Sequence, residues 1–242
     1  CSYSRMSAKK VVMIFIIIIS GIFYYQLAED SDDYYTTATV VRVIDGDTIE
    51  IENGQKVRML GINTPEKSQT FSGEATEFLK SQVLDKEVRL EIHGTDRYGR
   101  FLGYVFVGGQ NVNEQILWEG FGTLYYYGRD DHYNDLKKAE KNARDSGMGL
   151  WVASTKADCI KLVSLTYEET PKRCTNTEEL VLENTCDEDL DVVIKDDATH
   201  IYEEVILGNS VFRKNFSCIW NDAGDSVYVS DGEGMVLFWR YE

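Results

Sequence analysis

The sequence predicts a β-rich protein of two domains, in which a small five-stranded barrel with three helices is followed by a β-sandwich. Short strand-like runs separated by Gly, Asn and Asp turns occur in both parts of the chain. Segments with helical spacing lie only in the first part. With 242 residues, 43% hydrophobic and 27% charged, the chain is long and apolar enough for one or two compact cores.

The barrel is expected to begin with strands that polar turns interrupt. Residues 40–44 and 48–51 are rich in β-branched side chains, and an Asp-Gly-Asp turn at 45–47 separates them. A third run, at residues 56–62, follows an Asn-Gly pair at 53–54, which is a strong hairpin signal.

Helices and further strands follow in alternation. The apolar spacing predicts helices over residues 72–84, 113–118 and 133–146, and strands over residues 87–92 and 102–107. Asn113 is expected to cap the second helix, and Gly120 and Gly147 to end the second and third. Five short strands with three helices describe an OB-type barrel over residues 38–153.

The last third reads as a separate unit, residues 159–242. Its short alternating runs lie between Asn, Asp and Gly turns, which is typical of a β-sandwich. The expected strands are residues 179–183, 191–195, 200–205, 227–230 and 236–241. Asp222, Asp225 and Asp231 are interpreted as hairpin-turn residues, with ligand binding as the alternative.

The N-terminal residues 1–28 are expected to be a transmembrane anchor or a signal peptide. Basic residues precede an uncharged apolar run, and an acidic polar spacer at residues 29–37 follows it. No good small-residue cleavage site follows, so we expect an uncleaved anchor through residues 11–28, with the domains outside the membrane. Cleavage and secretion is the alternative.

The net charge of −16 argues against a broad electrostatic grip on nucleic acid. Residues 154–242 carry 8 basic and 19 acidic side chains, whereas residues 36–153 carry 14 and 18. A polyanion would therefore be bound locally in the middle segment, by arginines and lysines with a metal ion offsetting the carboxylates.

Polar side chains gather at the predicted strand ends between residues 45 and 66. They include Asp47, Arg58 and Glu66. Carboxylates beside an arginine suit a hard cation and an anionic substrate held side by side. Taken singly, each has an ordinary explanation, namely a turn aspartate, a surface ion pair and a first-turn helix acid.

Four motifs in order resemble the staphylococcal (thermonuclease-type) nuclease family over residues 40–151. They are I-D-G-D-T at 44–48, R-M-L-G-I-N-T-P-E at 58–66, T-D-R-Y-G-R at 95–100 and V-N-E at 112–114. Each motif is weak alone, but their combination is specific. The family fold is an OB barrel with three helices, in agreement with the pattern above.

The resemblance implies a calcium-dependent nuclease acting on DNA or RNA. Asp47, Asn63 and the backbone carbonyl of Thr64 match the calcium ligands, and Asn63 departs from the family's aspartate, which predicts weaker calcium binding. Glu66 matches the general base, and Arg58 and Arg100 match the arginines that bind the phosphate.

Three tyrosines are candidate substrate contacts, because aromatic rings stack on bases: Tyr98, Tyr125 and Tyr127. Packing in the core or in a loop is the equal alternative for each. The histidines His93, His132 and His200 lie in separate segments without metal-ligand spacing, so we expect them to be structural.

The last third resembles lamin-tail domains, which are immunoglobulin-like, in its L-V-L-E-N and W-N-D-A-G-D-S segments. An attachment role with an unknown partner follows from that resemblance. Its four cysteines, Cys159, Cys174, Cys186 and Cys218, allow two disulfides in three pairings, with buried free thiols as the alternative.

The sequence thus predicts a membrane-anchored or secreted calcium-dependent nuclease. The first rival is a non-catalytic OB module on the cell surface that binds nucleic acid or protein, and the second is an adhesion protein. Arg58, Glu66 and Arg100 favour the enzyme, because a binding module has no need of a base.

Overall fold

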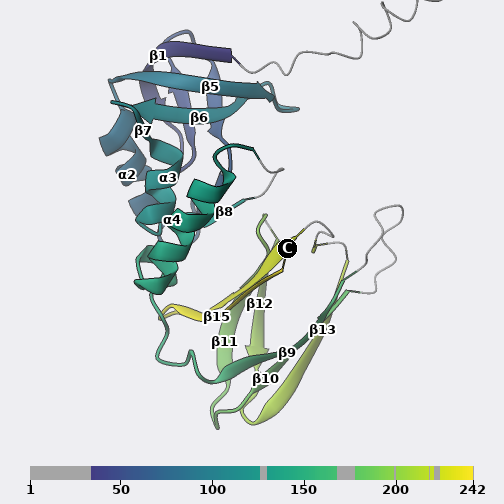
Figure 1. Ribbon diagram of the computed structural model, residues 1–242. Helices are drawn as coiled ribbons and strands as arrows, with labels where there is room; N and C mark the ends of the chain where they lie inside the picture. The colour runs from purple at the N-terminus through teal and green to yellow at the C-terminus, as the bar shows by residue number, and fades with distance from the viewer. Residues whose placement is uncertain are drawn as a thin grey trace, which may run out of the picture.

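The computed structural model describes residues 34–125, 130–167, 178–198, 200–217, 219–220 and 224–241 (Figure 1). The expected anchor at residues 11–28 lies outside these ranges, as do Tyr127, Cys174, Cys218 and Asp222. Within the described ranges, none of the helices has the length and apolar character needed to cross a membrane.

The first domain is the predicted closed barrel of five strands. They are β1 (Tyr34–Val43), β2 (Thr48–Ile51), β3 (Lys56–Met59), β5 (Glu87–Thr95) and β6 (Phe101–Val107). Neighbours in the order β3-β2-β1-β5-β6 pair antiparallel, and a parallel pairing of β3 with β6 closes the barrel. A short strand, β7 (Gln110–Asn111), pairs antiparallel with the end of β6. Closure leaves the five strands without a free edge.

Three helices accompany the barrel, and Figure 1 shows them grouped on the side from which the chain continues to the second domain. They are α2 (Ser72–Val83), α3 (Val112–Trp118) and α4 (Tyr133–Asp145). A two-residue ladder joins β4 (Ile62–Asn63) to β8 (Thr123–Leu124), and the Leu124 N–H donates to Glu140 of α4. Leu79, Ile116 and Leu136 of the three helices are buried in the same core as Ile49 and Leu90 of the strands.

The expectation that Asn113 caps α3 is wrong, because the cap lies two residues earlier. Asn111 caps the helix, because its side-chain oxygen accepts from the backbone N–H of Asn113 and Glu114. Asn113 lies inside the helix, fully buried, and its amide bonds Leu60 O at 2.8 Å and Val105 N at 3.0 Å. Its polarity serves to join barrel segments rather than to begin the helix.

The second domain contains two sheets with an apolar core between them, as predicted for a sandwich. One sheet has the order β13-β10-β9 and the other β12-β11-β14-β15. The strands are β9 (Ile160–Thr166), β10 (Glu178–Asn184), β11 (Leu190–Lys195), β12 (Ile201–Ile206), β13 (Ser210–Phe216), β14 (Asp225–Ser230) and β15 (Met235–Tyr241).

Two of these strands, β9 and β13, are missing from the sequence-based expectation. Both flank β10 as outer strands of their sheet. Val163 and Val211 are 55% and 51% exposed, so apolar residues occupy both faces of these strands. That mixture obscures the alternation on which strand prediction depends.

Three residues of the sandwich acquire definite roles. Cys159 forms a disulfide with Cys186, which selects the pairing of these two cysteines. Asp225 is not the hairpin-turn residue that was expected. It is 1% exposed at the start of β14, where its carboxylate accepts from the backbone N–H of Asp197 and Ser226.

The two domains touch through an apolar cluster and a paired linker. Trp151, in a short 3-10 helix η1 (Gly149–Trp151), packs edge-on against Phe238 with ring centroids 5.1 Å apart. Ala153 forms a parallel bridge with Met235, and Ser154 Oγ donates to Asp231 Oδ2 at 2.6 Å. These contacts hold the start of the sandwich against its own last strands and against α4.

Candidate active site

Asp47 is the centre of the candidate site, and a tight turn places it. Gly46 packs so closely that a Cβ there would lie 2.7 Å from Thr64 Oγ1 and 2.8 Å from Ala75 Cβ. Asp45 Oδ1 accepts the backbone N–H of Asp47 at 3.1 Å, which shapes the turn. The Asp-Gly-Asp turn therefore brings the start of β2 against the 62–66 segment.

The Asp47 carboxylate is 5% exposed, and donors contact both of its oxygens. Thr64 donates to Oδ2 from its backbone N–H at 2.9 Å and from Oγ1 at 2.8 Å. Thr48 Oγ1 donates to Oδ1 at 3.1 Å, and Arg58 Nε lies 3.2 Å from the same oxygen. Since a carboxylate has about four acceptor positions, these contacts satisfy the buried charge.

The neighbouring Asp45 carboxyl is affected by this charge. Burial raises the pKa of Asp45, and the negative charge of Asp47 raises it further, whereas a backbone hydrogen bond acts in the opposite direction. Asp45 thus acts as a turn residue beside the buried Asp47 carboxylate.

Arg58, on β3, is braced on three sides. Its Nη1 donates to Met59 O at 2.7 Å and to Ile62 O at 3.0 Å, and its Nη2 donates to Asn63 Oδ1 at 3.3 Å. With the Asp47 contact, these bonds engage four of the five guanidinium N–H groups. Among the described contacts, the fifth N–H group has no partner. It belongs to Nη2, whose other N–H donates to Asn63.

Asn63 faces two directions. Its oxygen accepts from Arg58, whereas its Nδ2 donates to Ala198 O at 2.8 Å and to Asp197 O at 3.2 Å, across the domain boundary. The residue is 7% exposed. The amide that replaces the family's aspartate therefore joins the barrel to the sandwich.

Glu66 lies two residues beyond Thr64 with an exposed side chain. Its backbone N–H donates to Gln69 Oε1 at 3.0 Å, which holds the start of the loop before α2. An exposed carboxylate at this position is accessible to water and substrate, as a base requires.

Arg100 and Tyr98 lie in the loop between β5 and β6. Arg100 Nε donates to Asp96 Oδ2 at 2.7 Å. Burial alone would raise the pKa of Asp96, but hydrogen bonds from Arg100 and Tyr98 outweigh it and lower the pKa. Tyr98 is 69% exposed, and Arg97 Nη2 donates to its hydroxyl at 2.8 Å. This loop presents arginines and an aromatic ring to solvent.

The remaining predicted contact residues are less informative. Tyr125 donates its backbone N–H to Gly61 O at 3.0 Å, next to the β4–β8 ladder.

The three histidines pair with carboxylates: His93 and His132 each lie 3.0 Å from Glu91 Oε1, and His200 lies 2.5 Å from Asp196 Oδ2.

Lys195, which sequence reasoning did not single out, is influenced by the charges of the candidate site. It is the last residue of β11, half-buried, and burial lowers the pKa of its ammonium. Four carboxylates oppose that shift, namely Asp196, Asp197, Glu66 and Asp47. No local pattern signals this role, because Lys195 and Asp47 lie in different domains.

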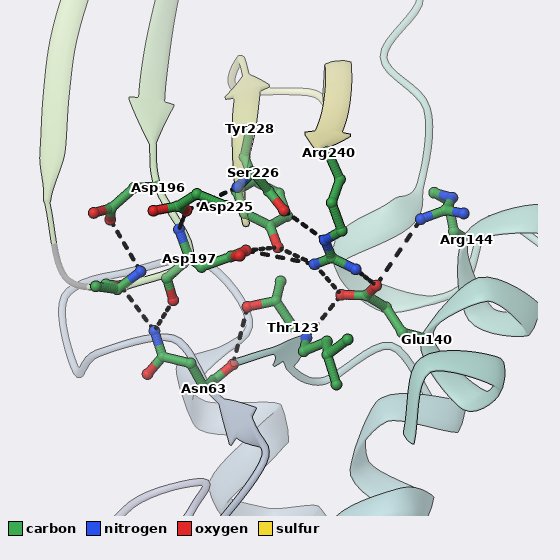
Figure 2. A network of polar contacts seen from close by, with 12 residues as sticks. Asn63, Thr123, Glu140, Arg144, Asp196, Asp197, Asp225, Ser226, Tyr228 and Arg240 are labelled. Carbon is green, nitrogen blue, oxygen red and sulfur yellow. Dashed lines mark hydrogen bonds and ion pairs between the residues drawn. The ribbon is translucent and has the colours of Figure 1, made fainter. Parts of the chain in front are cut away.

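A polar network fixes the sandwich beside the site, and Figure 2 shows it from close by. Arg240 forms hydrogen bonds to both Glu140 oxygens and lies 3.4 Å from Asp197 Oδ1. Glu140 Oε1 accepts Leu124 N at 2.7 Å, and Tyr228 OH donates to Asp197 Oδ1 at 2.6 Å. Burial is the main cause that raises the pKa of Asp197 to about 6.

The oxygen atoms around Asp47 are of the chemical type that binds a hard cation. A carboxylate, the amide oxygen of Asn63 and the carbonyl of Thr64 are oxygen ligands of the type that calcium prefers. Across the described residues there is no cluster of three or more His, Cys, Asp or Glu side chains suited to a metal ion. An ion here would therefore rely on one carboxylate with neutral oxygens, and would compete with Arg58 for Asp47.

The fold and the site together define an OB-barrel protein with a carboxylate–arginine pair at its strand ends. A family model described as staphylococcal nuclease homologue matches residues 56–153 and stops before β9. The thermonuclease of Staphylococcus hyicus is 35% identical over 127 residues, 48% of this chain and 75% of that protein. The chain therefore belongs to the staphylococcal nuclease family.

Two further relatives agree with that assignment. The micrococcal nuclease of Shigella flexneri is 38% identical over 125 residues, 46% of this chain and 71% of that protein. An uncharacterized endonuclease of Escherichia coli is 38% identical over 119 residues, 46% of this chain and 74% of that protein. These matches cover less than half of the present chain.

Proposed function

We propose that the chain is a calcium-dependent nuclease that hydrolyses phosphodiester bonds of DNA or RNA. The observation that carries the proposal is the braced Arg58, held 3.2 Å from the buried Asp47, in a barrel of this family. The relatives named thermonuclease, micrococcal nuclease and endonuclease support the same reaction class.

Asp47, Asn63 and the Thr64 carbonyl are the residues that would hold calcium. When bound, the ion would supply positive charge to neutralise the phosphate. Asn63 contributes no negative charge, so we expect calcium binding weaker than a site with two aspartates would give.

The chain's own side chains supply the rest of the chemistry. The free N–H of Arg58 Nη2 would donate to a phosphate oxygen, and the bonds to Met59 and Ile62 keep the guanidinium oriented. Glu66 would take a proton from the attacking water, or orient that water. Arg100 would stabilise the charge that develops on the phosphate, and Tyr98 would stack on a base.

Replacing Glu66 tests the mechanism. Glu66→Gln keeps the size of the side chain but removes the base, so we expect cleavage of a labelled DNA or RNA oligonucleotide to fall about 100-fold or more. The matched control is Glu74→Gln, an exposed glutamate on α2, which should retain full activity. Assays would run with calcium and with chelator.

Two outcomes would contradict the proposal. Full cleavage by Glu66→Gln would remove Glu66 from the mechanism, and cleavage in chelator would remove calcium. Binding of the oligonucleotide without any cleavage by the wild-type chain would favour the alternative, a non-catalytic binding module.

We also propose that the domains act outside a membrane, either anchored through residues 11–28 or secreted. The Cys159–Cys186 disulfide supports an oxidising compartment. Fractionation of cells that produce the full chain distinguishes the two forms, and recovery only from the reducing interior would refute both. We propose in addition that the lamin-tail-like sandwich attaches the protein to a partner.

A further inference from the structure

The sandwich reaches the candidate site through Asn63. Asn63 Nδ2 donates two hydrogen bonds, and both end on backbone carbonyls of the sandwich, those of Asp197 and Ala198. An ionised aspartate has no donor and would be repelled by two carbonyl oxygens. The asparagine at this position thus gives the barrel a specific attachment to the segment after β11.

That segment, residues 195–198, is also held by hydrogen bonds within the sandwich. The Asp196 carboxylate is fully buried and accepts the backbone N–H of Ala198 at 3.0 Å. The backbone N–H of Asp197 donates to Asp225 Oδ1 at 3.0 Å. The turn is therefore tied to β14 as well as to Asn63.

A continuous set of polar contacts links the two domains. Asp197 contacts Arg240, Arg240 pairs with Glu140, and Glu140 accepts the N–H of Leu124 in β8. β8 pairs with β4, in which Asn63 lies opposite Thr123. Figure 2 shows these contacts between residues of the barrel and residues of the sandwich. Buried, satisfied networks of this kind hold one relative orientation.

This fixed orientation determines where Lys195 lies. Lys195 pairs with Tyr228 of β14 and Ile201 of β12, in the middle of its sheet. Its ammonium lies in the field of Asp47 and Glu66, the carboxylates proposed for calcium and for the base. Arg100, by contrast, has its ion pair with Asp96 in its own loop.

We propose that Lys195 is a substrate-binding residue of the nuclease site, supplied by the sandwich domain to contact phosphate oxygens. The inference rests on the proposed nuclease function. A half-buried lysine three residues before Ala198, whose carbonyl Asn63 binds, offers a compact charge with three N–H donors near the two carboxylates. It would offset the excess of acidic residues in the sandwich at the one place where a polyanion must approach.

The same charge has a second consequence. An ammonium whose charge acts at Asp47 also repels a divalent cation there, so its removal should tighten calcium binding in the absence of nucleic acid. Phosphate binding and calcium binding are therefore expected to change in opposite directions, and neither measurement requires cleavage.

The experiment compares the full-length wild type with Lys195→Met, Lys195→Arg and the control Lys161→Met, an exposed lysine on β9. Binding of a fluorescent single-stranded oligonucleotide is measured in chelator, and calcium binding by calorimetry without oligonucleotide. For Lys195→Met we expect oligonucleotide binding to weaken about tenfold and calcium binding to tighten several-fold. Lys195→Arg should retain most oligonucleotide binding, and Lys161→Met should change neither.

Circular dichroism confirms folding, and Lys195→Arg gives a reading even if the methionine variant fails to fold. Unchanged oligonucleotide binding in Lys195→Met, or an equal loss in Lys161→Met, would overturn the proposal. Tighter calcium with unchanged oligonucleotide binding would show that Lys195 only opposes the cation, which also overturns it. A wild type that binds but never cleaves would refute the proposed nuclease activity and not this contact.

Discussion

The substitution Asn63→Asp restores the carboxylate that the family pattern expects, and the structure shows what it would cost. In the wild type, Asn63 Nδ2 donates two hydrogen bonds, of 2.8 and 3.2 Å, to carbonyls of the sandwich. The carboxylate loses both donors and faces the two carbonyl oxygens with a negative charge. It gains a charge-assisted bond to Arg58, whose Nη2 lies 3.3 Å from the present amide oxygen.

The magnitude follows from these contacts. Two hydrogen bonds contribute about 0.5–1.5 kcal/mol each, and the stronger Arg58 bond returns about 1 kcal/mol. Repulsion between the new carboxylate and the two carbonyl oxygens adds to the net loss, so we expect the free energy of unfolding to fall by about 1–2 kcal/mol and the melting temperature by roughly 2–8 °C. Calcium binding should tighten about tenfold, because the variant has one more carboxylate ligand.

Thermal unfolding with chelator and calorimetric calcium titration measure the two effects separately. Asn53→Asp is the matched control, since Asn53 is exposed and its side-chain oxygen accepts from Gln55 N, which a carboxylate also does. Unchanged or higher stability of Asn63→Asp in chelator would refute the role of Asn63 as a link between the domains. Unchanged or weaker calcium binding would count against its assignment as a ligand.

Two further predictions concern the network between the domains. Arg240→Met should lower the free energy of unfolding by about 3–5 kcal/mol in chemical denaturation, because it leaves buried Glu140 and Asp197 without their shared cation. Arg213→Met, which removes an exposed ion pair, should cost less than about 1 kcal/mol, and equal losses would contradict the argument. Asp197→Asn tests the pKa of Asp197, which rises from 3.8 to about 6. A raised pKa means that this carboxyl's contribution to stability is full below about pH 4 and is lost as pH rises through about 6. The variant should therefore gain on the wild type by up to about 3 kcal/mol across that window, and a difference independent of pH would disprove the assignment.

The barrel could be predicted because its information is local. Alternating apolar residues, the Asn-Gly turn at 53–54 and the glycines after α3 and α4 specify each element within a few residues. The site motifs lie on adjacent strands, so their order along the chain already placed Asp47 near Arg58 and Thr64. The same local reading failed for Asn113, because its partners Leu60 and Val105 lie on other segments.

The meeting of the two domains could not be read from the chain. Asn63 and Ala198 are 135 positions apart, and a hydrogen bond between them depends on how two folded surfaces pack. Local periodicity places Lys195 at the end of a strand but contains no information about which carboxylates it will face. The sequence alone therefore determined the barrel, its family and the identity of the charged groups. The packing of the sandwich against the barrel determined that Asn63 is a link and that the charges of Asp47 and Glu66 act on Lys195, because charges and donors act through distance in space and not along the chain.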